Sequence, residues 1–247
     1  MASEIKAVIF DLGGTLIYSD EVWPDLMQTA MRELLSYLQD QGLPLKEDGF
    51  LKEFHARLQD YYVQRDAEFV EYTTAHVLRT LLADMEQPAL TEEQMNTALR
   101  QLYAVSQAHW QPEEDALPTL DQLQAAGYRM AIISNASDDA DVQTLVDKAG
   151  LRGYMDFVLS SAACGIRKPN PLIFQTGLDE WGLAPAQVAM VGDTLGADIL
   201  GARNAGLYSI WITRRADKAA NRDHDETIQP DAVIATLAEL PGLLSNR

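Results

Sequence analysis

Residues 5–16 read Ile-Lys-Ala-Val-Ile-Phe-Asp-Leu-Gly-Gly-Thr-Leu, and this stretch decides the fold. An apolar run that starts at a polar residue and ends at a double glycine is typical of a buried strand in a parallel sheet. The strand ends at Asp11, and Gly13 and Gly14 then let the chain turn sharply, because glycine has no Cβ atom. Ligands of open α/β sheets bind beyond the carboxyl ends of the strands. The position of Asp11 therefore predicts a functional carboxylate.

The chain from Leu117 onward alternates between apolar, strand-like runs and helical patterns. The predicted strands cover 128–134, 157–160, 188–191, 208–212 and 231–235, and the predicted helices cover 119–126, 138–149, 170–180 and 197–205. Repeated alternation of this kind predicts an α/β fold with a doubly wound, mostly parallel, Rossmann-like sheet. The polar segment 214–230 is predicted to be a surface loop.

Residues 20–110 carry almost no strand signal, and their apolar residues recur at helical spacing. Thr91-Glu92-Glu93-Gln94 has the pattern of a capping box that opens the last long helix of this region. We therefore predict that a helical domain interrupts the α/β domain after its first strand. The predicted boundaries are 1–17 and 113–247 for the α/β core, and 18–112 for the helical insert.

Composition bounds the class of protein. The 247 residues are 47% apolar and 23% charged, as in an ordinary globular protein, and no apolar stretch approaches the roughly 20 residues that span a bilayer. The first predicted strand begins at Ile5, which leaves no room for a secretory signal peptide. The single cysteine, Cys164, excludes an internal disulfide. These features predict a cytoplasmic protein without a membrane partner. We expect it to be a monomer or a homodimer.

The net charge is −18, from 19 basic and 37 acidic residues. Such a charge argues against nucleic acid and anionic membranes as partners. It also means that an anionic substrate would need a locally positive site.

Polar side chains follow four of the predicted strands at the point where each ends or in the loop beyond it. They are Asp11, Ser134-Asn135, Lys168-Pro169, and Gly192-Asp193 with Asp198. Each motif alone is weak evidence for a functional site. Serines and aspartates at strand ends most often form turns or helix caps, and a lysine before proline is most often an exposed charge. In a parallel sheet, however, the carboxyl ends of all strands lie at one edge, so these residues can converge.

Taken together and in this order, the motifs resemble those of the haloacid dehalogenase (HAD) superfamily, most of whose members are phosphatases. The matching stretches are Phe10–Leu16, Ile132–Asn135, Gly165–Pro169 and Val191–Asp198. The resemblance covers the whole predicted core, and the helical insert stands where the family's helical C1 cap stands. It implies a HAD-like hydrolase with a C1-type cap.

The resemblance also implies a role for each matching residue. Asp11 would attack phosphorus and form an aspartyl-phosphate that water hydrolyses. Lys168 would pair with this nucleophile and with the phosphoryl oxygens, while the Ser134 hydroxyl and the Asn135 backbone N–H would hold the phosphoryl group. The implied substrate is a small phosphorylated metabolite.

A cofactor follows from the same resemblance. Mg²⁺ would be held by Asp11, Asp193 and the backbone carbonyl of Gly13. Asp198 would not bind the ion itself but would orient Lys168 or a metal-bound water. The ion together with Lys168 would make the site attractive to an anion despite the overall charge.

The chain departs from the family at Gly13, where the phosphatases carry a second aspartate that protonates the leaving oxygen and activates water. A positioned acid or base increases the rate by about 10²–10⁴-fold, so its absence should lower the rate of hydrolysis most for an alkyl phosphate. Tyr18, Asp20 and Glu21 are candidate substitutes, although ordinary surface polarity is the simpler interpretation of each.

Three functions stay open at this point. The first is a working phosphatase, with a substitute acid or a substrate that has a good leaving group. The second is a slow or inactive relative that binds a phosphorylated ligand or a protein. The third is cleavage of a carbon–halogen or carbon–phosphorus bond, against which the complete Gly192-Asp193…Asp198 motif and the lack of a recognisable Schiff-base lysine in the insert argue. A receiver domain, which also has a strand-end aspartate and a Lys-Pro pair, is disfavoured by the long helical insert.

The histidines show no metal-ligand spacing and are assigned to the surface or to packing. His109-Trp110, at the return from the insert to the core, is expected to pack at the hinge.

Overall fold

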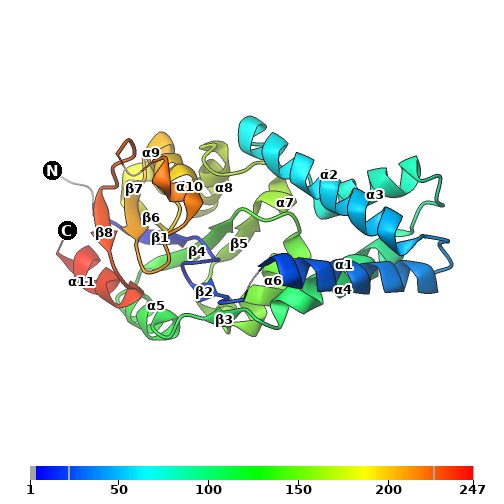
Figure 1. The fold of residues 1–247 in the computed structure, drawn as a ribbon. Coiled ribbons are helices and arrows are strands. Elements are labelled where there is room, and N and C mark those ends of the chain that lie inside the picture. Colours follow the sequence, from blue (N-terminus) through cyan, green and yellow to red (C-terminus); the bar gives the residue numbers. More distant parts are fainter. Residues whose placement is uncertain (1–3, 22, 225, 247) are drawn as a thin grey trace.

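A computed structural model describes residues 4–21, 23–224 and 226–246 of the chain. Six parallel strands form one sheet in the order β5-β4-β1-β6-β7-β8, so β1 lies near its centre. The strands are β1 Ala7–Phe10, β4 Arg129–Ser134, β5 Phe157–Ser160, β6 Val188–Gly192, β7 Tyr208–Ile212 and β8 Ala232–Ile234. The predicted α/β fold with a mostly parallel sheet is confirmed (Figure 1).

Helices cover both faces of this sheet. The core helices are α5 Ala116–Ala125, α6 Asp139–Lys148, α7 Ser161–Cys164, α8 Leu172–Trp181, α9 Leu200–Ala205, α10 Ala219–Arg222 and α11 Leu240–Ser245. Alternate residues of β1 point to opposite faces, as the period of two in a strand requires. Val8 and Phe10 belong to a buried cluster with α5, α6 and α11, whereas Ala7 and Ile9 pack with α8 and α9.

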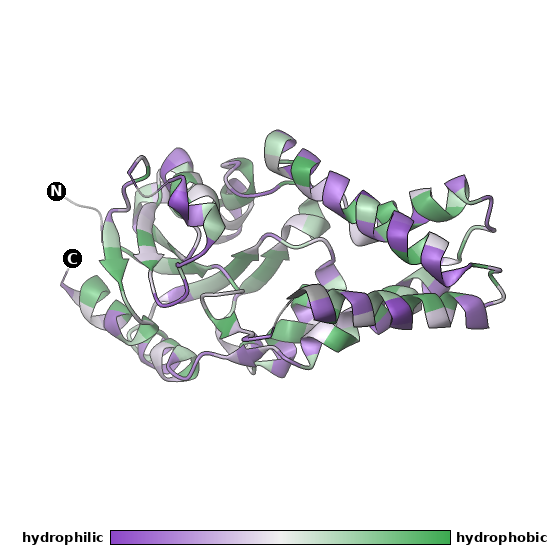
Figure 2. Cartoon of the chain, viewed as in Figure 1, coloured by the Kyte–Doolittle hydropathy of each residue, from purple (hydrophilic) through white to green (hydrophobic). Residues whose placement is uncertain are grey.

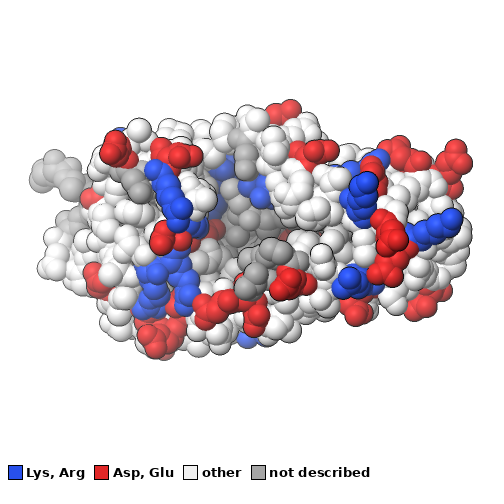
Figure 3. Space-filling model, in the orientation of Figure 1, with Lys and Arg blue, Asp and Glu red and all other residues white. Residues whose placement is uncertain are grey.

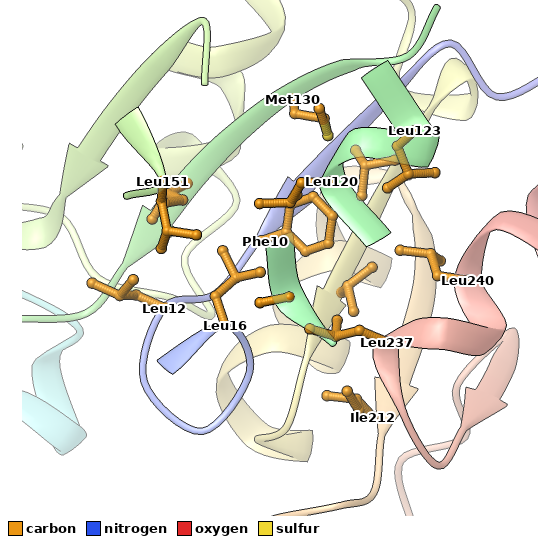
Figure 4. Close-up of a cluster of buried hydrophobic side chains, with 14 of the residues drawn as sticks. Phe10, Leu12, Leu16, Leu120, Leu123, Met130, Leu151, Ile212, Leu237 and Leu240 are labelled. Atoms are coloured by element: carbon orange, nitrogen blue, oxygen red, sulfur yellow. The ribbon is translucent and has the colours of Figure 1, made fainter. Parts of the chain in front are cut away.

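The first of these clusters fills the space between the sheet and α5, α6 and α11 (Figure 4). Phe10, Leu120 and Leu237 are fully buried in it. Burying a side chain of this size stabilises the fold by about 1.5–3 kcal/mol. Because Phe10 directly precedes Asp11, this packing also fixes the end of the strand that carries the aspartate.

The helical insert consists of α1 Trp23–Asp40, α2 Glu47–Glu68, α3 Thr74–Asp84 and α4 Glu92–Gln107. It has a buried apolar cluster of its own, with Leu38, Phe54 and Leu81 fully enclosed. The predicted capping box of α4 is present, since Thr91 and Gln94 each accept a hydrogen bond from the other's backbone N–H. Purple, hydrophilic residues mark the outer surfaces of α1 and α2 in Figure 2, and green residues concentrate in the central sheet. Within the described residues, no helix is long and apolar enough to cross a membrane.

The two connections between insert and core pair with each other, which the sequence did not predict. Ile17–Tyr18 (β2) and Gln111–Pro112 (β3) form a short antiparallel ribbon. The chain therefore leaves and re-enters the core at one place, next to the turn that follows Asp11.

The insert also contacts the core through its segment 69–74. Val70 forms a β-bridge with Ile166, and the backbone N–H of Glu71 donates to the carbonyl of Gly165 at 3.0 Å. The Glu71 carboxylate is fully buried and accepts hydrogen bonds from Tyr61, Ser161 and Arg167. Segment 69–74 is thus fastened to the loop that immediately precedes Lys168.

The segment 214–230 differs from its predicted form. It contains α10, and Ala216, Asn221 and Ile228 are buried, so it is packed against the core rather than lying loosely on the surface. Its apolar residues are too few and too widely spaced to give a helix or strand pattern, which explains why the sequence indicated only a loop.

The buried pair of Glu71 and Arg167 yields a prediction for stability. Replacing Glu71 by Ala takes the carboxylate from a guanidinium that stays buried, so we expect the free energy of unfolding to fall by about 3–5 kcal/mol. The double variant Glu71→Leu, Arg167→Met removes both charges, so its free energy of unfolding should fall clearly less than that of Glu71→Ala. Urea unfolding of the native protein and the two variants measures these differences. An equal decrease in the free energy of unfolding of both variants would show that an unpaired buried charge is not the cause of the destabilisation.

Candidate active site

Asp11 directly follows the central strand, and its backbone N–H donates to the carbonyl of Val191 on the neighbouring β6 at 2.9 Å. The Lys168 ammonium lies 2.7 Å from Asp11 Oδ1 and 2.7 Å from Asp198 Oδ1, and it donates a third hydrogen bond to the carbonyl of Ile133. The lysine side chain is 1% exposed. Four predicted motifs, carried on separate parts of the chain, thus meet at one buried charge.

Asn135 sets the position of Lys168. Its side-chain amide accepts a hydrogen bond from the Lys168 backbone N–H at 2.9 Å and donates one to the Lys168 carbonyl at 3.0 Å. The predicted contribution of Asn135 was its backbone N–H. The structure gives its side chain a second task, which is to fix the backbone of the lysine.

Three carboxylates converge beside this lysine. Asp11, Asp193 and Asp198 each offer an oxygen, and these oxygens lie within 4.8 Å of one another. Asp193 follows β6, and Asp198 lies in the π-helical turn Leu195–Ile199, where its Oδ2 accepts a hydrogen bond from the Thr194 N–H at 2.9 Å.

Two glycines make room for these carboxylates. Gly14 has a φ of +81°, and a Cβ atom there would lie 2.3 Å from Asp193 Oδ2. A Cβ atom at Gly192 would lie 2.3 Å from Asp198 Cγ. Any other residue at either position would displace a carboxylate of the site.

Burial and mutual repulsion shape the ionisation of the site. Burial raises the pKa of Asp193, as does the charge of Asp11, while Lys218 opposes the shift. Burial likewise raises the pKa of Asp198, despite Lys168, and the charges of Asp11 and Asp193 raise it further. Burial alone would lower the pKa of Lys168, but Asp11 and Asp198 more than offset this and raise it. The cluster thus holds more negative charge than its two ammonium groups balance.

The segment 214–230 supplies residues to the site that the sequence did not reveal. Lys218 Nζ lies 2.5 Å from Asp193 Oδ2, and the amide of Asn221 contacts the Asp193 carbonyl and the Leu195 N–H. His224 packs on Gly196, where its Nε2 would lie 3.0 Å from an added Cβ atom. A lysine and an asparagine in a polar stretch carry no spacing signal, so only the fold reveals them.

A cavity of about 560 Å³ opens over the carboxyl edge of the sheet. The predicted residues that line this main cavity are Asp11, Gly13, Ser134, Asn135, Lys168 and Asp198. Asp193 is almost fully buried beneath it. The helical insert adds Arg65 and Phe69 to the wall, and segment 214–230 adds Asp223 and His224. In Figure 3 blue atoms of basic side chains are visible between the core and the insert.

Gly13 lines the main cavity, and the Trp110 ring lies against it. A Cβ atom at Gly13 would be 3.3 Å from Trp110 Cη2 and 3.6 Å from Cζ3. Trp110 therefore stands next to the place of the missing aspartate, rather than serving only as packing at the hinge.

The three candidate substitutes for that aspartate lie elsewhere. Asp20 is paired with Arg215 at 2.9 Å, and the same guanidinium lies 3.7 Å from the centre of the Tyr18 ring. Glu21 lies 3.5 Å from His109. None of the three lines the main cavity as the described residues define it. The simpler interpretation, that these are polar side chains with partners outside the cavity, fits all three.

Comparison with known proteins agrees with this geometry. The sequence profile of the haloacid dehalogenase-like hydrolases matches residues 5–206. The chain belongs to this family. It is therefore a HAD-like hydrolase, and the resemblance stated from its motifs is confirmed.

Individual relatives span more than one chemistry. Over 241 residues, 97% of this chain, it is 31% identical to the whole glyceraldehyde 3-phosphate phosphatase of Methanothermobacter thermautotrophicus. It is 30% identical to the ribulose-1,5-bisphosphate 5-phosphatase of Halopiger xanaduensis, covering 97% of this chain and 99% of that protein. Among solved structures, a 2-haloacid dehalogenase from Pseudomonas syringae pv. tomato has a TM-score of 0.67 and 28% identity, covering 98% of this chain and 99% of that one.

The acidic cluster of this HAD-like hydrolase suits a divalent cation. Its ligands are oxygens, which Mg²⁺ prefers, and burial together with the negative charge of neighbouring aspartates raises the pKa of Asp193 and Asp198. A bound cation would relieve that repulsion.

A binding prediction follows. Mg²⁺ should raise the melting temperature of the native protein, because a ligand at 100 times its Kd stabilises the folded state by about 2.7 kcal/mol. Asp193→Asn should lose most of this shift, whereas Asp20→Asn, which removes an exposed acid of the same charge, should keep it. Thermal unfolding with Mg²⁺ and with EDTA measures the shift, and equal shifts in both variants would place the ion elsewhere.

Proposed function

We propose that this HAD-like hydrolase is a Mg²⁺-dependent phosphatase that acts on a small phosphorylated metabolite through an aspartyl-phosphate on Asp11. The observation that carries the proposal is the Asp11 carboxylate, which lines the main cavity and is held by Lys168 beside two further carboxylates. The relatives at 30–31% identity over nearly the whole chain are phosphatases of small sugar and triose phosphates, which supports it.

In this mechanism a carboxylate oxygen of Asp11 attacks phosphorus, and the bond between phosphorus and the ester oxygen breaks. The departing oxygen leaves with its negative charge and then takes up a proton from solvent water. A second water attacks phosphorus and gives up a proton to solvent, the bond between phosphorus and the Asp11 oxygen breaks, and inorganic phosphate and the Asp11 carboxylate result. Lys168 keeps Asp11 in place and lowers the repulsion between carboxylate and phosphate.

The phosphoryl group would be held by the Ser134 hydroxyl and the Asn135 backbone N–H. Mg²⁺, bound by Asp11, Asp193 and the Gly13 carbonyl, would supply the positive charge that an anionic nucleophile and an anionic substrate require. Asp198 acts through Lys168, to which it is bonded at 2.7 Å.

The absence of an acid at position 13 limits the leaving group. Without a proton donor the departing oxygen must carry negative charge, so acyl and aryl phosphates should react faster than alkyl phosphates. The helical insert, residues 18–112, would act as a C1-type cap that closes over the main cavity and excludes water. A cytoplasmic location and a monomeric or homodimeric state stay predictions from the sequence.

The first test of the function compares an aryl phosphate with an alkyl phosphate in Mg²⁺. We expect native protein to hydrolyse the aryl ester faster, and Asp11→Asn to lower kcat by roughly 10³-fold or more, because it removes the nucleophile. Asp20→Asn is the control and should keep its rate.

A carbon–halogen hydrolase is the second candidate, because a 2-haloacid dehalogenase is among the similar structures. The same assay should therefore include 2-chloropropionate. Chloride release that depends on Asp11, with no phosphate release, would replace the phosphatase proposal. A protein inert on all three substrates would instead favour a binding role.

A second prediction concerns position 13. Gly13→Asp restores the acid, but its Cβ atom crowds the Trp110 ring, so the single variant should lose about 1–3 kcal/mol of stability. Trp110→Phe removes the ring atoms that cause the crowding.

The double variant Gly13→Asp, Trp110→Phe should regain part of this stability and hydrolyse the alkyl phosphate about 10-fold or more faster than native protein. Urea unfolding and alkyl phosphate turnover of the native protein, both single variants and the double variant give the coupling between the sites. Additive effects on stability would mean that Trp110 does not restrict position 13.

A further inference from the structure

Glu71 places a fully buried carboxylate at the joint between the helical insert and the core. It lies in segment 69–74, between α2 and α3, and it accepts hydrogen bonds from three side chains. Tyr61 belongs to α2, Ser161 begins α7 of the core, and Arg167 lies in the loop that follows α7. Burial raises the pKa of the Glu71 carboxyl group, while Arg167 and Ser161 oppose the shift. One side chain of the insert is therefore bonded to two separate parts of the core.

The first of these parts is the loop that carries Lys168. The Arg167 guanidinium donates to the Glu71 carboxylate, and the Arg167 backbone N–H donates to the carbonyl of Phe69 at 3.2 Å. The Glu71 backbone N–H in turn donates to the carbonyl of Gly165 at 3.0 Å. The insert thus binds both the backbone and the side chain of the residue that precedes Lys168.

The second part is the loop that carries Asn135. Ser161 Oγ donates to the Glu71 carboxylate at 2.6 Å and accepts a hydrogen bond from the Ala136 backbone N–H at 2.9 Å. The side-chain amide of Asn135, the residue before Ala136, is bonded to the backbone N–H and the carbonyl of Lys168. The contacts therefore form a closed ring, in which Glu71 holds the two loops and Asn135 joins them directly.

Directional contacts suit this place better than apolar packing would. An apolar pair of similar size can replace a buried ion pair with little loss of stability, but apolar contacts have no preferred direction. A buried polar network whose groups are all satisfied holds its members in one arrangement. Lys168 requires such an arrangement, because its ammonium lies 2.7 Å from both Asp11 and Asp198. A displacement of about 1 Å in an active site can lower the rate about 10²-fold.

We propose that Glu71 is a positioning residue for phosphoryl transfer. It holds the loops of Asn135 and Lys168 together, so that the docking of segment 69–74 on the core sets the position of the Lys168 ammonium against Asp11. This inference rests on the proposed phosphatase function, in which Lys168 holds the nucleophile and Asn135 the phosphoryl group. It gives the insert a role in catalysis that does not depend on contact with the substrate.

Glu71→Gln tests this role, because it keeps the size of the side chain but replaces one accepting oxygen by an N–H donor. With 4-nitrophenyl phosphate, an aryl ester, and Mg²⁺ we expect kcat to fall about 10-fold or more while KM changes less than about 3-fold. Ser161→Ala removes one arm of the ring and should also lower kcat. The double variant Glu71→Gln, Ser161→Ala should be at most about 2-fold slower than the slower single variant, since both changes act through the same ring.

Amide hydrogen exchange, followed by NMR, reports on the two loops without turnover. The N–H groups of Ala136 and Lys168 are bonded to Ser161 and Asn135 and not to Glu71, yet Glu71→Gln should speed their exchange about 10-fold or more. All variants are measured well below their unfolding temperatures, so that loss of folded protein does not contribute.

Gln107→Leu is the matched control. It removes a hydrogen bond of 2.8 Å between α4 of the insert and Asp141 of the core, and it changes no residue of the ring. It should leave kcat and the exchange of the two amides unchanged.

Unchanged exchange at Ala136 and Lys168 in Glu71→Gln protein would overturn the proposal. A loss of stability without a change in kcat would overturn it as well, since Glu71 would then be a purely structural residue. So would a rise in KM at unchanged kcat, because it would assign Glu71 to substrate binding. If native protein hydrolyses no phosphate ester, the phosphatase function fails instead. The exchange of the two amides then decides by itself whether Glu71 holds the loops, with faster exchange supporting that role and unchanged exchange refuting it.

Discussion

The rest of the site depends on the two buried ion pairs that the Lys168 ammonium forms with Asp11 and Asp198. Three carboxylates within 4.8 Å of one another could not stay ionised and buried without nearby positive charge. Lys168 provides that charge and, through the Ile133 carbonyl, ties the cluster to the strand next to β1. The sheet therefore does more than hold the aspartates in place, because its strand ends also complete the hydrogen bonding of the lysine.

The loop that carries Lys168 is shared by core and insert. Asn135 binds its backbone from the core, while Glu71 binds the adjacent Arg167 from the insert. The same glutamate also accepts a hydrogen bond from Tyr61 of α2. The loop that carries Lys168 and helix α2 are thus joined by one connected set of buried polar contacts. A change in the insert at Glu71 would reach the lysine through a single intervening residue.

The sheet and its motifs could be predicted from the sequence because their signals are local. Each strand is a short apolar run that ends at or just before a polar residue. The run of β1 ends at Phe10, before Asp11, and that of β4 ends at Ser134. Parallel strands bring such ends to one edge of the sheet. The partners of those residues could not be predicted in this way. Lys218 and Asn221 lie in a polar segment without a distinctive pattern, and they reach the site only through tertiary packing. The same holds for Trp110, whose contact with Gly13 depends on how the chain returns from the insert.

The packing of Trp110 on Gly13 also constrains how the chain can evolve. A single step from glycine back to aspartate places a new side chain against an indole ring that already occupies the space. A smaller residue at position 110 would relieve this crowding, but that change by itself opens a void and brings no acid. The residues at positions 13 and 110 are therefore coupled, and an acidic side chain at position 13 is accommodated more easily beside a residue smaller than tryptophan.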